Sequence, residues 1–320
     1  MAQAAKRPRA IFFGTPQFAV PSLEALLEVA DVPLVVTQPD RPAGRRMKLT
    51  PPPVKELALQ RGIEVIQPRR VRRPALAEQL AALGADVAVV VAYGRILPPA
   101  LLAAPRLGCV NVHASLLPKL RGAAPIQWAV IGGDAESGVC LMQMDEGMDT
   151  GPVLACRSLA IGAEETAGEL SERLSKLGGE LLGQELPRYL RGELEPRPQD
   201  HARATLAPPL AKSHGRVDFS HSARALKNLI RGTAPWPGAY GYLDGRRIKL
   251  HRARVLVEAG ESGEPGTIVR ADRHGIEVAC GQGVVAIDEL QPEGKKRMTA
   301  EQFLAGHRCE AGARFDGGES

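Results

Sequence analysis

Two polar residues near the middle of the chain have the types and spacing of a catalytic pair. In "CVNVHASLLPKLRGAAPIQ" (109–127), Asn111 and His113 lie two residues apart in an apolar run, and a loop rich in Pro and Gly follows. Side chains at i and i+2 share one face of a strand. Histidine transfers protons near neutral pH, and an asparagine amide can donate to a developing oxyanion. The alternative is a polar strand end that bonds only to backbone.

A second candidate is the acidic turn "QMDEGMDTG" (143–151), which carries Asp145, Glu146 and Asp149 among glycines. A carboxylate in such a loop can orient a histidine and stabilise its charged form. The turn has this role only if it folds back onto His113, and otherwise it is an acidic turn in solvent. From the residues alone, either Asp145 or Asp149 can be the partner.

The elements that must position these residues alternate between strand and helix. Apolar runs predict strands at 10–14, 32–40, 63–68, 85–94 and 107–115. Helical spacing predicts helices over 21–30, 54–62 and 74–84. This order with short connections is typical of an α/β domain with a doubly wound, mostly parallel, Rossmann-like sheet. Ligands bind such sheets beyond the carboxyl ends of the strands, where Asn111 and His113 would lie.

The second half of the chain has a different pattern. Two strands around a tight loop are expected over 138–161, then a helix over 166–190. Residues 191–211 have several prolines and no periodicity, which predicts a linker. Short alternating runs after it predict a smaller C-terminal β-barrel of OB-like type. The expected organisation is a catalytic domain at 1–190, the linker at 191–211 and the β-barrel domain at 212–320.

Basic residues gather in two places. From Arg41 to Arg73 there are ten Lys or Arg against two Glu, and the segment begins with the long loop "DRPAGRRMK". Further on, Arg247 and Lys249 alternate along one face of an expected strand. Each cluster alone is typical of a solvated surface. Together, on two domains, they favour a large polyanion such as a nucleic acid.

Several classes of protein are disfavoured. The chain has no Gly-rich fingerprint after its first strand, which argues against a dinucleotide-dependent oxidoreductase. It has no H-E-x-x-H motif or Cys/His cluster, so we expect no metal. No window has the length of a membrane helix, and the N-terminal apolar run is too short for a signal peptide. The five cysteines are widely spaced, which predicts reduced, mostly buried thiols in a cytoplasmic protein.

The motifs converge on one family. "NVHASLLPKLRGAAPIQ" together with "MDEGMDTG" resembles the formyltransferases and hydrolases that use 10-formyltetrahydrofolate. Four further stretches resemble the members of this family that act on tRNA, over nearly the whole chain: "FFGTPQFAVPSLEAL", "TQPDRPAGRRMKLTPPPVK", "VVVAYGRILP" and "LIRGTAPWPGA". Relatives that formylate small amines share the Asn, His and Asp residues, so a small-molecule acceptor is the alternative within the family. An RNA-binding protein with an inactive α/β half is the alternative outside it.

The resemblance implies transfer of a formyl group from 10-formyltetrahydrofolate to the α-amine of methionine on initiator methionyl-tRNA. The reaction passes through a tetrahedral intermediate, serves translation initiation and uses no metal. The implied catalytic residues are Asn111, His113 and Asp149, with Asp149 favoured over Asp145 by the D-T-G match. The implied folate-binding residues are Ala92, Tyr93, Gly94, Ser115, Leu116, Leu117 and Pro118. The implied tRNA-binding residues are Arg41, Arg45, Arg46, Lys48, Arg247 and Lys249. We expect a monomer.

Overall fold

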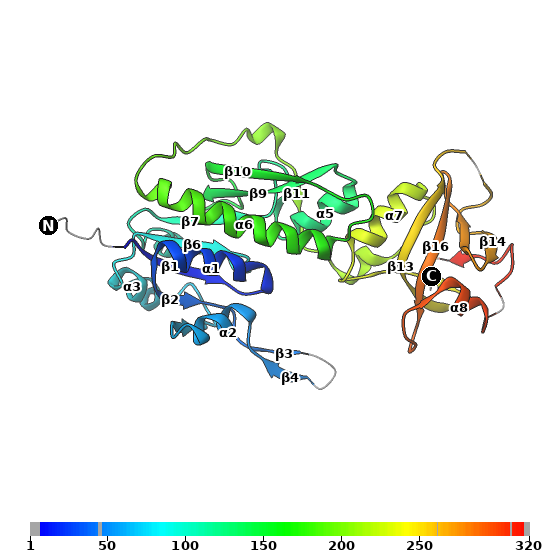
Figure 1. Ribbon diagram of the computed structural model, residues 1–320, viewed down its shortest axis with the longest axis horizontal. Coiled ribbons are helices and arrows are strands. Elements are labelled where there is room, and N and C mark those ends of the chain that lie inside the picture. Colours follow the sequence, from blue (N-terminus) through cyan, green and yellow to red (C-terminus); the bar gives the residue numbers. More distant parts are fainter. Residues whose placement is uncertain (1–6, 44–46, 261, 308, 317–320) are drawn as a thin grey trace. The chain divides into compact units, whose positions relative to one another are not determined.

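The chain folds into two compact units, each with its own sheet (Figure 1). The computed structural model describes residues 7–43, 47–260, 262–307 and 309–316. Unit 1 consists of Met1–Pro125, Ser137–Leu159 and Ser171–Ala207, and unit 2 consists of Ile126–Glu136, Ala160–Leu170 and Pro208–Ser320. Arg45 and Arg46, two of the predicted tRNA-binding residues, lie outside the described residues.

The sheet of unit 1 has seven strands and is mostly parallel. In spatial order they are β10 (Val153–Ala160), β9 (Glu136–Gln143), β7 (Cys109–His113), β6 (Val87–Val91), β1 (Arg9–Gly14), β2 (Asp31–Val36) and β5 (Glu64–Ile66). The pairs from β7 through β6, β1 and β2 to β5 are parallel, whereas β7 and β9 are antiparallel. The predicted doubly wound sheet is confirmed, and five polar or glycine-rich strand exits share one edge of it.

Helices and short elements complete this unit. They are η1 (Gln17–Ala19), α1 (Val20–Val29), β3 (Arg41–Ala43), β4 (Lys48–Thr50), α2 (Pro53–Gln60), α3 (Pro74–Ala82), α4 (Pro99–Leu102), β8 (Arg121–Gly122), α6 (Ala167–Leu190), η2 (His201–Arg203) and β11 (Leu206–Ala207). Strands β3 and β4 form an antiparallel hairpin between β2 and α2, within the predicted basic loop. Among the described residues, no helix is both long and apolar enough to cross a membrane.

The predicted linker is ordered over most of its length. Its residues up to Ala207 belong to unit 1. Arg197 forms a backbone bridge with Val153. Strand β11 pairs in parallel with β8, the short strand that comes directly after the loop following β7. The domain boundaries stay a prediction, but the segment returns to the edge of the sheet where ligands of this fold class bind.

Unit 2 contains a closed antiparallel sheet. Its strands are β12 (Ala239–Leu243), β13 (Arg246–Val257), β14 (Ile268–Asp272), β15 (Gly275–Ala279), β16 (Val284–Pro292), β17 (Met298–Thr299) and β18 (Phe315–Asp316). The order is β14-β15-β16-β13-β12-β18, and the amides of Ile268 and Phe315 donate to the carbonyls of Ala313 and Gly266. These bonds join the first strand to the last, so the sheet closes into the predicted barrel. Its helical elements are α5 (Pro125–Gly132), η3 (Lys212–Gly215), α7 (Ala223–Gly232) and α8 (Ala300–Leu304).

The expectation of reduced thiols is wrong for two cysteines. Cys140 on β9 and Cys156 on β10 form a disulfide, with a sulfur–sulfur distance of 2.05 Å. The two strands are neighbours in the sheet, and their pairing register, which composition does not reveal, brings the two side chains together. Cys109 and Cys280 are buried free thiols, and burial raises the pKa of Cys109 to about 12 and that of Cys280 to about 11. Both therefore stay protonated at neutral pH and are poor nucleophiles.

Two buried tyrosines of unit 1 differ in how their hydroxyls are satisfied. Tyr93 packs edge-on against Phe13 in the apolar core, and its hydroxyl has no hydrogen-bond partner among the described residues. Burial raises the pKa of this hydroxyl. The Tyr189 hydroxyl instead donates to the Leu107 carbonyl at 3.0 Å and accepts from the side-chain Nε2 atom of Gln143 at 2.8 Å. A buried hydroxyl without a partner costs free energy, whereas a paired one stabilises the fold.

We therefore predict opposite effects for the same substitution at these two positions. Tyr93→Phe should leave the melting temperature unchanged or raise it, because no hydrogen bond is lost. Tyr189→Phe should lower it by about 2–4 °C, corresponding to about 1 kcal/mol for a domain of this size. Differential scanning calorimetry of both variants measures this difference. Equal losses in the two variants would show that the Tyr93 hydroxyl has a partner.

Candidate active site

Asn111 and His113 lie on one face of β7 at its carboxyl end. The strand is paired on both sides, with β6 in parallel and β9 antiparallel, which fixes the direction of its side chains. His113 is only 6% exposed, and Asn111 is half-buried. The Nε2 atom of His113 is 3.1 Å from the Leu120 carbonyl, in the loop that follows the strand. The ring is therefore held from one side by backbone, and its Nδ1 atom points toward the acidic turn.

Asp149 brings the acidic turn into contact with both residues. Its Oδ2 atom is 3.6 Å from His113 Nδ1, and its Oδ1 atom accepts a 3.5 Å hydrogen bond from Asn111 Nδ2. The Gly122 amide donates to Oδ2 at 2.8 Å. Both ring nitrogens of His113 thus face oxygen acceptors, which fixes the orientation of the ring. Asn111 and His113 thus both lie against Asp149, and the catalytic role of these three residues stays a prediction.

Asp145, the other candidate partner, has a different place in the turn. Its Oδ1 atom accepts hydrogen bonds from the Gly147 amide at 3.0 Å and from the Thr150 hydroxyl at 2.7 Å. These bonds close the turn on itself and do not involve β7. Asp145 therefore shapes the turn, and Asp149 is the carboxylate that lies against His113.

The backbone near Asp149 is in an uncommon conformation that nearby residues stabilise. Asp149 has a φ of +55°, in the left-handed region. A side chain on Gly151 would place its Cβ 2.1 Å from the Gln143 carbonyl oxygen, and one on Gly122 would place it 2.7 Å from the Ala207 carbonyl oxygen. Only glycine fits at these two positions. The close approach of β8, β11 and the turn is what allows the carboxylate to reach β7.

Gln199 is a residue of this site that sequence reasoning missed. It is 8% exposed, and its Nε2 atom donates to the carbonyls of Asp149 at 2.9 Å and Gly151 at 2.7 Å. Its Oε1 atom accepts from Nε and from an Nη atom of the buried Arg121, at 3.1 and 2.7 Å. Gln199 lies in the segment expected to be a linker, where no periodicity or motif marked it. It fixes the backbone that presents the Asp149 carboxylate.

The predicted folate-binding positions offer backbone and apolar groups rather than their polar side chains. Ala92 and Gly94 are exposed, with φ of +46° and +79°, and flank Tyr93, whose side chain lies in the core. Ser115 is 1% exposed and donates to the Lys119 carbonyl at 2.6 Å. Side-chain contacts from Tyr93 and Ser115 to a ligand are therefore not available in this conformation. Leu116, Leu117 and Pro118 are half-buried in the loop after β7.

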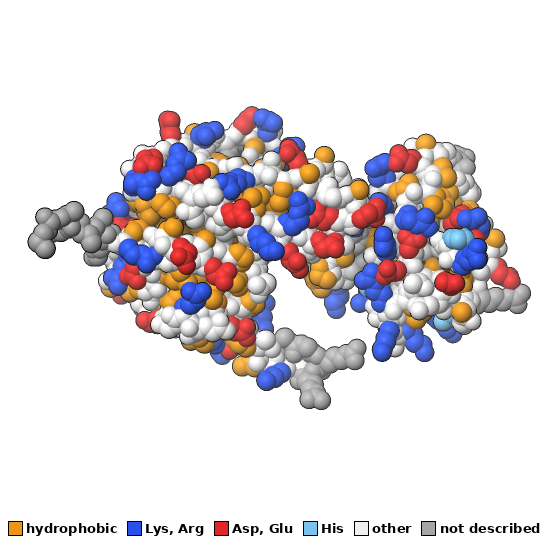
Figure 2. All heavy atoms as spheres, in the orientation of Figure 1, with side chains coloured by type: hydrophobic (Ala, Val, Ile, Leu, Met, Phe, Trp, Pro, Cys, Tyr) orange, Lys and Arg blue, Asp and Glu red, His pale blue; other side chains and the backbone are white. Residues whose placement is uncertain are grey.

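The predicted tRNA-binding residues that the structure describes fall on two surfaces, one in each unit. Arg41 and Lys48 are exposed on the β3–β4 hairpin of unit 1. In unit 2, Arg247 and Lys249 point to the outer face of β13, and the Arg247 guanidinium lies 3.9 Å from the centre of the Tyr240 ring. Lys and Arg are numerous on the face of unit 2 drawn in Figure 2, interspersed with carboxylates. Both surfaces present cations, as predicted.

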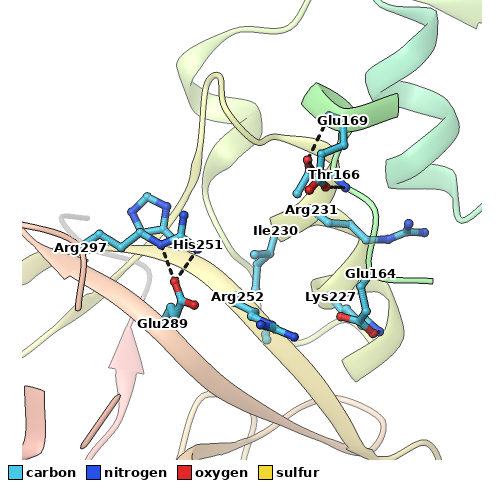
Figure 3. A pocket seen from close by; sticks show the side chains of 11 residues that line it. Glu164, Thr166, Glu169, Lys227, Ile230, Arg231, His251, Arg252, Glu289 and Arg297 are labelled. Atoms are coloured by element: carbon cyan, nitrogen blue, oxygen red, sulfur yellow. Dashed lines mark hydrogen bonds and ion pairs between the residues drawn. The ribbon is translucent and has the colours of Figure 1, made fainter. Parts of the chain in front are cut away.

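A separate cavity of about 280 Å³ lies within unit 2 (Figure 3). Its cations are largely paired already. Lys227 forms an ion pair with Glu164, Arg297 forms one with Glu289, and Arg231 donates to the carbonyls of Gly162 and Glu165. None of the predicted site residues lines it. The constellation at the end of β7 is the candidate active site.

The role of Gln199 can be tested without any ligand. Gln199→Glu keeps the acceptor for Arg121 but removes both donated bonds, and Gln199→Leu removes all of them. Because each bond stabilises by about 1 kcal/mol, both variants should exchange amide hydrogens at least about tenfold faster in the 144–152 segment. Hydrogen-exchange mass spectrometry measures this rate. Wild-type exchange in Gln199→Glu would mean that the two donated bonds do not hold the turn.

The chain matches known proteins over most of its length. Residues 9–186 match the family described as "Formyl transferase", and residues 209–308 match "Formyl transferase, C-terminal domain". The methionyl-tRNA formyltransferase of Myxococcus xanthus is 54% identical over 308 residues, which cover 96% of this chain and 98% of that one. That of Sorangium cellulosum is 53% identical over 305 residues, covering 95% and 98%.

A solved structure shares the fold. The N-formyltransferase from Helicobacter canadensis, in complex with folinic acid and dTDP-3-aminofucose, superposes with a TM-score of 0.67 at 19% identity, covering 88% of this chain and 99% of that one. At this identity the likeness concerns the fold alone. The two matching domains and the relatives above half identity show that the chain belongs to the formyl transferase family, among the methionyl-tRNA formyltransferases.

Proposed function

We propose that this chain transfers a formyl group from 10-formyltetrahydrofolate to the α-amino group of methionine on initiator methionyl-tRNA, with Asn111, His113 and Asp149 as its catalytic residues. The assignment of these catalytic residues rests on one observation, which is that their side chains lie together in the structure. The Asp149 carboxylate lies 3.5 Å from the Asn111 amide and 3.6 Å from the His113 imidazole, at the carboxyl end of β7. The identity of the relatives supports the reaction and both substrates. The transfer supplies the formylated initiator for translation.

The three side chains suit acyl transfer to an amine. As the neutral amine attacks the formyl carbon, the formyl oxygen becomes negative, and Asn111 Nδ2 donates to it. The 3.5 Å bond from Asn111 to Asp149 is long, so this amide can turn toward a stronger acceptor. Asp149 accepts the proton that the amine loses, while His113 stabilises the developing negative charge. The new carbon–nitrogen bond forms, the bond to folate N10 breaks, and N10 takes up a proton.

The exits of β6 and β7 suit the folate. Ala92 and Gly94 expose backbone with no large side chain, and Leu116 to Pro118 add apolar surface beside His113. A flat heterocycle with several donors and acceptors is recognised by such backbone groups on an apolar wall. The tRNA is bound by phosphate contacts from Arg41 and Lys48 on the hairpin and from Arg247 and Lys249 on the barrel.

We further propose that the enzyme acts as a monomer in the cytoplasm. Sedimentation velocity tests the monomeric state, and cell fractionation tests the location.

Formyl transfer from 10-formyltetrahydrofolate to charged initiator methionyl-tRNA is the direct test. Glycinamide ribonucleotide and free methionine serve as competing acceptors in the same assay. We expect transfer to the tRNA and none to the small amines. Transfer to a small amine alone would contradict the proposed acceptor, and binding of tRNA without any transfer would contradict the proposed chemistry.

Asn111→Ala should lower kcat by about 100- to 1000-fold, because one oxyanion donor is lost. The Kd for 5-formyltetrahydrofolate, which does not react, should stay within about twofold, since Asn111 acts on the developing charge. Asn228→Ala, in α7 of unit 2, is the matched control and should keep wild-type kcat. Single-turnover transfer and equilibrium binding measure the two quantities. A weaker Kd with unchanged kcat would make Asn111 a binding residue.

Arg41→Ala and Lys48→Ala should each raise the KM for tRNA and leave the Kd for folate, measured without tRNA, within about twofold. Each should also reduce the slope of log affinity against log salt by about one, because one phosphate contact is lost. Arg61→Ala is the control. Arg61 follows α2 directly before β5, so it lies at the opposite edge of the sheet from the hairpin. An unchanged salt slope in both hairpin variants would remove the hairpin from the tRNA site.

A further inference from the structure

Gln38 connects the candidate folate site to the hairpin that carries Arg41. It follows β2 and is only 6% exposed. Its Nε2 atom donates to the carbonyls of Tyr93 at 3.1 Å and Gly94 at 3.2 Å, in the segment proposed to bind folate. Its Oε1 atom accepts from the guanidinium of Arg95 at 3.2 Å and from that of Arg41 at 3.4 Å. One side chain therefore bonds to both proposed substrate-binding segments.

The backbone of Gln38 joins further strand ends. Its amide donates to the Thr15 hydroxyl at 3.3 Å, and that hydroxyl donates to the Tyr93 carbonyl at 3.2 Å. Its carbonyl accepts from Gln67 Nε2 at 2.8 Å. Because Thr15 follows β1, Gln67 follows β5 and Tyr93 follows β6, the exits of four parallel strands meet at this one residue. A shift of the Gln38 side chain must therefore move both segments to which it bonds, namely the segment at 92–94 and the hairpin at Arg41.

A second group of side chains fixes the chain as it leaves Gln38 for the hairpin. Lys55 Nζ donates to both oxygens of Asp40, at 2.8 and 2.9 Å, and to Gln67 Oε1 at 2.8 Å. Gln67 Nε2 also donates to Asp40 Oδ1 at 2.7 Å. The hydrogen bonds from Lys55 and Gln67 hold the pKa of Asp40 below its ordinary value, so the carboxylate stays charged at neutral pH. The start of the hairpin is thereby held against the same strand ends as Gln38.

We propose that Gln38 is a positioning residue that couples the two substrate sites, so that occupation of the folate segment at 92–94 strengthens binding of tRNA through Arg41, and the reverse. This inference rests on the proposed function. A carboxamide is the one neutral side chain that supplies two N–H donors and an acceptor oxygen from a single planar group, which is what two carbonyls and two guanidinium groups require here. Glutamate would place a carboxylate against the carbonyls of Tyr93 and Gly94, and methionine would remove every hydrogen bond that the side chain makes.

The test measures coupling rather than affinity alone. The Kd for 5-formyltetrahydrofolate is measured with and without saturating uncharged initiator tRNA, for the wild type, Gln38→Met and Gln38→Glu. Gln60→Met, an exposed substitution at the end of α2, is the matched control. In the wild type and the control, tRNA should tighten folate binding by about fivefold or more, the usual lower range of coupling between sites. In Gln38→Met and Gln38→Glu the ratio of the two Kd values should fall to about one.

A variant that is merely less stable would weaken both Kd values and keep their ratio, so the ratio separates positioning from a general structural role. Melting temperatures of all variants show which are folded, and Gln38→Glu, equal in size to the wild type, provides the result if Gln38→Met does not fold. A wild-type ratio of one, or an unchanged ratio in a folded Gln38 variant, would overturn the inference. Absence of formyl transfer by the wild type would contradict the proposed function instead.

Discussion

The position of one carboxylate, that of Asp149, determines how the site of unit 1 is built. The Asp149 side chain is only 18% exposed, so its carboxylate needs hydrogen-bond donors from the protein. It accepts hydrogen bonds from the Gly122 backbone amide and from Asn111, and it lies beside His113. Bringing it there requires an antiparallel strand, β9, next to β7, and a turn with left-handed backbone at Asp149 itself. It also requires glycine at 122 and 151, where any side chain would clash with a carbonyl oxygen. The features around the site follow from this one placement.

The same edge of the sheet supports both proposed substrates. Parallel strands end together, so their exits provide backbone groups at β6 and β7 and a side chain, Gln38 after β2, that bonds to both the β6 exit and Arg41. The segment from 191 to 207 returns to this edge and contributes Gln199 to the turn. The proposed chemistry, the proposed folate contacts and the basic hairpin therefore depend on one set of strand ends. A substitution that shifts this edge should affect more than one substrate, whereas one in the barrel should affect tRNA alone.

Most of the architecture could be predicted because its signals are local. Buried parallel strands such as β1 and β6 are largely apolar, and the helices α2 and α3 between them are each followed closely by glycine, so both the order and the sheet type followed from the sequence. The pair Asn111 and His113 was visible as polar residues at a strand end. The choice of Asp149 over Asp145 needed the resemblance to a family, because the difference lies in how the turn folds back.

The remaining features depend on contacts between distant residues. Gln199 stands 50 residues from Asp149, in a segment without periodicity, and only the folded chain brings them together. The disulfide between Cys140 and Cys156 depends on the pairing of β9 with β10, which the spacing of the cysteines in the sequence does not reveal. Tyr93 follows a strand in a segment predicted to bind folate, yet its ring packs into the core beside Phe13.

Asn111 and Asp149 are proposed to act as parts of one unit on the reacting group. A double-mutant cycle on kcat for formyl transfer tests it, using Asn111→Ala, Asp149→Asn and the double variant under single-turnover conditions. Residues that act as a unit are strongly non-additive, so the double variant should lose little more than the worse single variant. If the losses in kcat instead multiply, so that two factors of about 100 combine to about 10,000, the two residues act independently and not as one unit.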